Sequence, residues 1–216
     1  IYFSLFSVSF AAHPLITDDT GTQGKGEFQL EINGETNYDK EITSDEDTGE
    51  HITVKETGGE AAASLSYGIA DTADIVFGFP YHWSIVKENG TETSDEDGLS
   101  DLSVEIKWMF YEKDGLSLAM KPGITLPAGD DEKGLGAGRM TYSLFFITTK
   151  DIEPMFALHA NIGYIRNENK GDERKDIWHA SLASTVEVMK NLQLVANIGA
   201  EKNPDKTSHT DPAFIL

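Results

Sequence analysis

The stretch Asp101–Phe110, which reads DLSVEIKWMF, decides the fold. Apolar side chains fill every second position, and Asp101, Glu105 and Lys107 stand between them. Side chains of a β-strand point alternately to its two faces, so this strand has one apolar and one charged face. A soluble sheet buries its apolar face against a second layer, whereas a membrane barrel turns that face toward lipid and keeps charge inside.

The same alternation recurs along the chain. Each segment is about 9–12 residues long, enough for a tilted strand to cross a bilayer, whereas sandwich strands average about 5–6 residues. The expected strands are about nine, at residues 28–32, 61–69, 75–85, 102–110, 116–126, 140–146, 156–164, 178–188 and 192–198.

The connections between these segments alternate in length. Short turns are expected at residues 70–73, 112–115, 151–153 and 189–191. Long polar loops are expected at residues 38–58, 87–100, 127–138, 167–175 and 202–212. Long loops on one side and short turns on the other are typical of outer-membrane barrels, whereas a Greek-key sandwich gives no reason for this sorting.

Composition narrows the function classes. The 216 residues carry a formal charge of −20, which argues against nucleic acid as a partner and against a basic surface for anionic lipid. The absence of cysteine excludes thiol catalysis and cysteine-based zinc sites. No stretch approaches the ~18 consecutive apolar residues of a membrane helix, but barrel strands escape that test.

The N-terminus predicts export. Residues 1–12, IYFSLFSVSFAA, resemble the end of a signal peptide with its cleavage site, although a buried first strand is the alternative. We therefore expect a signal-peptide remnant at 1–12, a periplasmic segment at 13–26 and a barrel domain at 27–216, with the C-terminal strands missing. The expected localisation is the outer membrane of a Gram-negative bacterium.

Two stretches resemble a known family. Residues 14–26 read P-x-x-T-D-D-x-G-T-x-G-K-G, and Lys121–Asp130 is followed by Gly134, Leu135 and Gly136. Both are similar to the outer-membrane family named for the meta-pathway of phenol degradation. The resemblance implies a transmembrane up-and-down β-barrel of roughly 12 strands, of which this chain would hold about nine to ten, and uptake of aromatic compounds.

Counting alternate positions places charged side chains inside the barrel. Facing acids and bases there could form a constriction that sorts solutes by charge, with Lys107, Lys121 and Arg139 as its positive side; an internal salt-bridge network that only stiffens the barrel is the alternative. The expected lumen residues are Glu27, Glu31, Glu35, Glu60, Glu105, Lys107, Lys121, Arg139, His159, His179 and Glu187.

Three other features have a functional and a simpler interpretation. Thr17, Asp18, Asp19 and Gly21 could form a plug-like periplasmic segment or a simple turn in which glycine supplies a positive φ. The acidic loops with Asp45, Asp47, Asp95 and Asp97 could bind Ca²⁺ or Mg²⁺ and bridge to lipopolysaccharide, or could merely be solvated. His179 and Ser181 share a face, but without a third orienting group we expect no enzyme.

The sequence thus predicts a passive channel or uptake porin for small, hydrophobic or aromatic solutes. The expected partners are outer-membrane lipid, lipopolysaccharide and the solute, with no nucleic acid and no cofactor beyond the loop-bound ions. Two alternatives stay open: an occluded structural or ligand-binding barrel, and an exported soluble β-sandwich.

Overall fold

A computed structural model describes residues 17–44, 51–153, 155–189, 192–206 and 212–215. The expected signal-peptide remnant at 1–12, residues 13–16 of the expected periplasmic segment, and the candidate metal ligands Asp45 and Asp47 lie outside these ranges. No helix among the described residues is long and apolar enough to cross a membrane.

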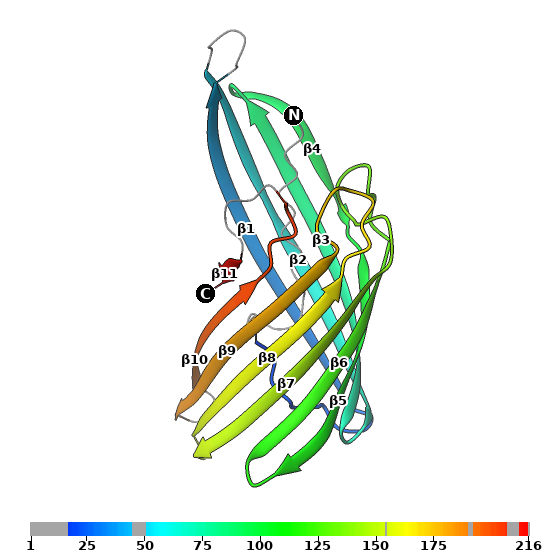
Figure 1. Ribbon diagram of the computed structural model, residues 1–216, viewed down its shortest axis with the longest axis vertical. Coiled ribbons are helices and arrows are strands. Elements are labelled where there is room, and N and C mark those ends of the chain that lie inside the picture. The colour runs from blue at the N-terminus through cyan, green and yellow to red at the C-terminus, as the bar shows by residue number, and fades with distance from the viewer. Residues whose placement is uncertain (1–16, 45–50, 154, 190–191, 207–211, 216) are drawn as a thin grey trace.

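The described strands form one curled antiparallel sheet in which neighbours in the chain pair side by side (Figure 1). This confirms the all-β, up-and-down barrel prediction and contradicts a sandwich of two packed sheets. The strands are β1 (Phe28–Ser44), β2 (His51–Ala70), β3 (Ala73–Glu88), β4 (Thr91–Leu99), β5 (Leu102–Lys113), β6 (Leu116–Leu126), β7 (Thr141–Glu153), β8 (Phe156–Arg166), β9 (Asp176–Met189), β10 (Leu192–Glu201) and β11 (Ala213–Ile215).

One strand, β4, was not expected. The predicted loop 87–100 contains β4, because Asn89 and Gly90 have positive φ angles of 49° and 85°, and Asn-Gly is the preferred pair for a two-residue hairpin turn. β4 pairs with residues 81–88 of β3, while β5 pairs with residues 73–78 of the same edge. The short β11 follows β10.

The predicted loop 38–58 is also largely strand. β1 and β2 stay in register from Phe28 with Tyr67 to Ser44 with His51. Alternation stops there because β1 and β2, together with the β3–β4 hairpin, project beyond the rest of the sheet (Figure 1), so neither face of this extension has to be apolar. Backbone pairing and β-branched residues such as Ile42, Ile52 and Val54 suffice to continue the strands.

The two faces of the sheet differ as the alternation predicts. Large apolar side chains are exposed on the outer face, among them Ile162 at 69% and Leu182 at 59%. The inner face buries polar groups together with a small apolar cluster of Ala119, Phe145, Ile147, Ile165 and Ile177. A soluble sheet has the opposite arrangement.

Candidate functional site

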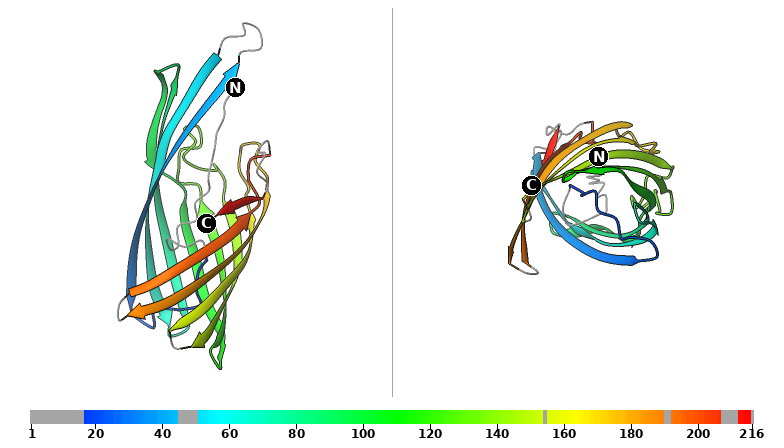
Figure 2. Two further views of the ribbon diagram at one scale, coloured as in Figure 1. Left: turned by 90° about the vertical axis from the view of Figure 1, so that its left-hand side faces the viewer. Right: turned by 90° about the horizontal axis from the view of Figure 1, so that it is seen from below.

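Residues 17–27, the N-terminal segment, lie inside the curled sheet. Viewed from below, the sheet forms an open ring and this segment crosses its interior (Figure 2). The Thr17 hydroxyl donates to Asn197 Oδ1 of β10 at 2.5 Å, and the Thr20 N–H donates to Thr149 Oγ1 of β7 at 3.1 Å. The segment is therefore hydrogen-bonded to strands that lie far apart in the curled sheet, which we call the wall.

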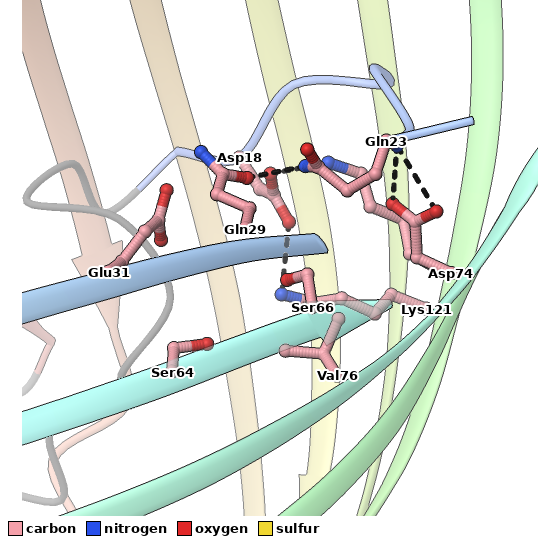
Figure 3. A pocket seen from close by; sticks show the side chains of 10 residues that line it. Asp18, Gln23, Gln29, Glu31, Ser64, Ser66, Asp74, Val76 and Lys121 are labelled. Atoms are coloured by element: carbon pink, nitrogen blue, oxygen red, sulfur yellow. Dashed lines mark hydrogen bonds and ion pairs between the residues drawn. The ribbon is translucent and has the colours of Figure 1, made fainter. Parts of the chain in front are cut away.

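Asp18 makes the central charged contact between the segment and the wall. Its carboxylate accepts from Lys107 Nζ of β5 at 2.9 Å and from Lys121 Nζ of β6 at 3.0 Å. All three residues are at least nine-tenths buried, and Glu105 Oε2 stands 3.6 Å from Lys121 Nζ. Figure 3 shows Asp18 and Lys121 pointing toward one another, joined by a dashed line. Because every charge has an opposite neighbour, burial of the lysines is compensated.

The backbone of Asp18 is held as well. With its amide oriented to satisfy both groups, Asn161 donates to the Asp18 carbonyl at 2.9 Å and accepts from the Asp18 N–H at 2.6 Å. Further along the segment, the Gln23 N–H donates to Asp74 of β3 at 3.0 Å. Side chains from β3, β5, β6 and β8 thus fix the backbone and carboxylate of the segment together.

The segment leaves the interior past Gly68. A Cβ atom at this position would lie 1.8 Å from the Gly24 carbonyl oxygen, and Gly26 N–H donates to the Gly68 carbonyl at 2.8 Å. Positive φ angles occur at Gly24 and Gly26, not at Gly21, where the sequence placed one. Gly21 instead donates its N–H to Asp19 Oδ1, which is the turn chemistry expected of this motif.

Two cavities differ in their relation to the segment, because only the smaller one is lined by segment residues, Asp18 and Gln23. The smaller has a volume of about 30 Å³ and is lined by Asp18, Glu31, Asp74, Lys107 and Lys121 among others, which leaves room for only a few water molecules. The larger has a volume of about 460 Å³ and lies at the short-turn ends of β7–β10, where Asp151, Glu153, Thr185, Glu187 and Gln193 line it. Docking of the segment therefore leaves little free volume beside Asp18, Lys107 and Lys121.

The predicted lumen residues fall into three groups. The first group is buried in the wall and consists of Glu60, Glu105, Lys107, Lys121, His159 and His179. Glu31 and Glu187 line the cavities. Glu27 and Glu35 are exposed, and Arg139 is exposed in the loop before β7, so it does not join the two lysines. Sequence reasoning missed Asp74 and Asn161, because nothing local marks them as partners of the N-terminal segment.

Both interior histidines belong to hydrogen-bond networks. His159 lies 2.9 Å from Thr149 Oγ1 and 3.2 Å from Thr185 Oγ1. His179 lies 3.0 Å from Ser181 Oγ and 2.9 Å from Glu201 Oε2, so the structure supplies the third group that the sequence did not reveal. His179 and Ser181 are buried, and neither of the two cavities is lined by these three residues.

A second buried carboxylate holds the loop between β6 and β7. Asp101 accepts from the Gly129 N–H at 3.0 Å and from the Ala137 N–H at 2.8 Å. Burial raises the pKa of Asp101 above its ordinary value, and these N–H donors oppose the rise. Leu135 is also buried here, so the loop 127–140 is folded against the outer end of the sheet.

The remaining candidate metal ligands, Asp95 and Asp97, lie on β4. Both are exposed, and the Asp97 carboxylate accepts from the Tyr81 hydroxyl. Within the described part of the chain, no group of three or more histidine, aspartate and glutamate residues could hold a metal ion.

Comparison with known families gives one match. The family described as "Putative MetA-pathway of phenol degradation" matches residues 17–214, which is nearly the whole chain and begins within the N-terminal segment. No curated protein matches the chain.

Proposed function

The chain belongs to the family of the MetA-pathway of phenol degradation, and from this premise we propose that it is an outer-membrane β-barrel. Its proposed role is to give small, hydrophobic or aromatic solutes a passive path across that membrane. The observation that carries the proposal is the docking of Asp18 between Lys107 and Lys121, which puts a narrow polar interior inside a wall with an apolar outer face.

The membrane location is supported by the distribution of polarity. Exposed apolar side chains recur on β5, β7, β8 and β9, and include Trp108, Phe146, Ile162 and Leu182. Monomeric soluble proteins rarely expose large contiguous apolar patches. This apolar surface matches the lipid-facing band of outer-membrane barrels, whose charged groups face inward.

The passive path is supported by what fills the interior. The N-terminal segment and its partners are polar. Carboxylates, lysines and amides line the cavity beside the segment, and carboxylates and an amide are among the residues that line the larger cavity. Such an interior can hold water and small solutes. The segment limits the width, so the proposed path is narrow and passes large solutes poorly.

The second candidate is an occluded structural barrel. The tight packing of Thr17, Asp18 and Thr20, all buried, favours it, because a closed interior needs no path. In either case we propose that the chain is no enzyme and needs no cofactor, and that its partners are membrane lipid, lipopolysaccharide through the outer loops, and the solute.

Heat-modifiability is the first experiment, because a closed barrel resists detergent until it is boiled. The full protein, extracted from outer membranes, should migrate faster on a gel when unboiled. Recovery of the protein in the soluble periplasmic fraction, with no shift in migration, would contradict the membrane barrel.

Planar-bilayer recording then tests the path. We expect small, discrete conductance steps, and a several-fold larger conductance for Asp18→Asn, because the segment loses its charge contacts with two lysines. Asp39→Asn, at an exposed position of β1, removes the same charge remote from the interior and should leave conductance unchanged. Absence of conductance in both the native protein and Asp18→Asn would favour the occluded barrel.

A further inference from the structure

The buried charges of the wall and segment are unequal in number. Among the described residues, two buried side chains are cations, Lys107 and Lys121, against five buried carboxylates, Asp18, Glu60, Asp74, Asp101 and Glu105. Arg139, the third cation expected from the sequence, is exposed in a loop. The interior therefore lacks the positive side that a constriction for anions would need.

The two lysines are also already neutralised. Lys107 lies 2.9 Å from Asp18 and 3.5 Å from Asp19, and Lys121 lies 3.0 Å from Asp18 and 3.6 Å from Glu105. Three carboxylates thus surround two ammonium groups. An arriving anion would have to displace one of these carboxylates, whereas an arriving cation meets a net negative field.

The larger cavity adds charge of the same sign. Asp151, Glu153 and Glu187 line it, and among the described residues none of them forms an ion pair with a lysine or arginine. A continuous set of hydrogen bonds joins this cavity to the N-terminal segment, from Thr185 through His159 and Thr149 to Thr20. The three carboxylates are exposed at the short-turn ends of β7 and β9, an end of the curled sheet that we take as one mouth of the interior.

We propose that the interior excludes anions and passes neutral and cationic solutes, and that Asp151, Glu153 and Glu187 determine this selectivity together with the segment. The proposal rests on the proposed function and specifies its solute class. Rings of acidic side chains are a common basis of cation selectivity. The field of an uncompensated carboxylate favours a cation about fivefold over a neutral solute at about 4 Å, even in water.

Reversal potentials in a potassium chloride gradient test the proposal on the full protein. We expect potassium permeability to exceed chloride permeability about 25-fold at low salt, because the field that favours the cation about fivefold disfavours the anion by about the same factor. The preference should fall steeply near 1 M salt, where screening is strong. The variant Asp151→Asn/Glu153→Gln/Glu187→Gln should bring the ratio close to unity without abolishing conductance.

A matched variant separates the local effect from net charge. Asp39→Asn/Glu41→Gln/Glu92→Gln also removes three negative charges, at exposed positions of β1 and β4, and should keep the native ratio. Liposome swelling with benzylamine and with benzoate gives a second reading, in which benzylamine should enter faster.

The outcomes distinguish the two proposals. A conducting protein that has a ratio of unity, or that prefers chloride, overturns the selectivity while leaving the path intact. An equal loss of selectivity in both triple variants also overturns it, because the carboxylates at the mouth would then have no special role. A protein that neither conducts nor swells liposomes overturns the path and the selectivity together.

Discussion

The N-terminal segment and the loop 127–140 are both held by a buried carboxylate. The carboxylate lies on the docked chain in the first case and on the wall in the second. In the segment, Asp18 is carried by the docked chain and the wall supplies Lys107 and Lys121. At the loop, Asp101 stands between β4 and β5, and the docked chain supplies the N–H groups of Gly129 and Ala137.

The two contacts therefore differ in which substitutions break them. A contact between charged side chains can be broken by substitution on either side, and it leaves a buried charge without its counterion. A contact through backbone N–H groups survives most changes in the loop, because every residue except proline keeps its donor. Apart from a proline in the loop, only substitution of the acceptor Asp101 removes these hydrogen bonds.

The largest effect is expected for Asp18→Ala. Both lysines would lose their shared counterion, and breaking a buried pair of this kind costs about 3–5 kcal/mol. We expect the segment to leave its site, which limited trypsin digestion at Lys25 in detergent micelles would report as faster cleavage. Cleavage at the native rate would show that Asn161, Asp74 and the threonine contacts hold the segment without the charge.

The next largest effect is expected for Gly68→Ala, which would displace the segment by a steric clash with its backbone. The new Cβ would meet the Gly24 carbonyl oxygen at 1.8 Å, and overpacking of this kind costs about 1–3 kcal/mol. Hydrogen exchange of residues 24–27 should accelerate. Gly34→Ala is the matched control, because its Cβ would only reach ordinary contact at 3.7 Å from Glu60 O.

A smaller effect is expected for Asp101→Ala, which tests the other anchor. Two N–H groups would lose their acceptor, with a cost of about 2 kcal/mol given the partial access of water. Hydrogen exchange should accelerate at residues 129–137 alone, with the N-terminal segment unaffected. Acceleration in both regions would mean that the two docked chains are coupled rather than independent.

The smallest effect is expected for pH in the loop between β8 and β9. Arg166 and Lys175, at 2.7 and 3.3 Å, hold the pKa of Glu168 below its ordinary value of 4.5. The stabilisation is therefore fully present above pH 4.5 and is lost as pH falls through the lowered pKa. The protection factors of residues 167–175, which correct the exchange rates for the intrinsic pH dependence of amide exchange, should fall in acid, and Glu168→Gln should remove that fall. Protection factors that stay constant with pH in the native protein would contradict the ion pairs.

The sequence was sufficient for the wall because alternation is a local property. Positions such as Ile106 and Lys107 fall on the faces that period-two counting assigns, and apart from β4 the strands pair in the order of the chain. The Asn89–Gly90 turn shows that one local signal was underused, since this pair marks a hairpin where a loop was expected.

The site could be predicted only in part because its contacts are not local. Asp18 and Lys121 belong to the two stretches that carry the family resemblance, yet no pattern in either stretch says that they meet. Arg139 shows the converse. It stands at an alternate position that the counting assigns to the inner face, but it is exposed in a loop because β7 begins only at Thr141. Pairing across the interior depends on how the sheet curls, which alternation does not specify.

The partners of the N-terminal segment also set an order of events. Asp18 contacts residues 89 and 103 positions away, and Thr17 contacts a residue 180 positions away. Contacts that close such long stretches of chain form slowly, and Asn197 is available only once β10 is in place. The first described residues of the chain are therefore among the last to reach their final positions during folding.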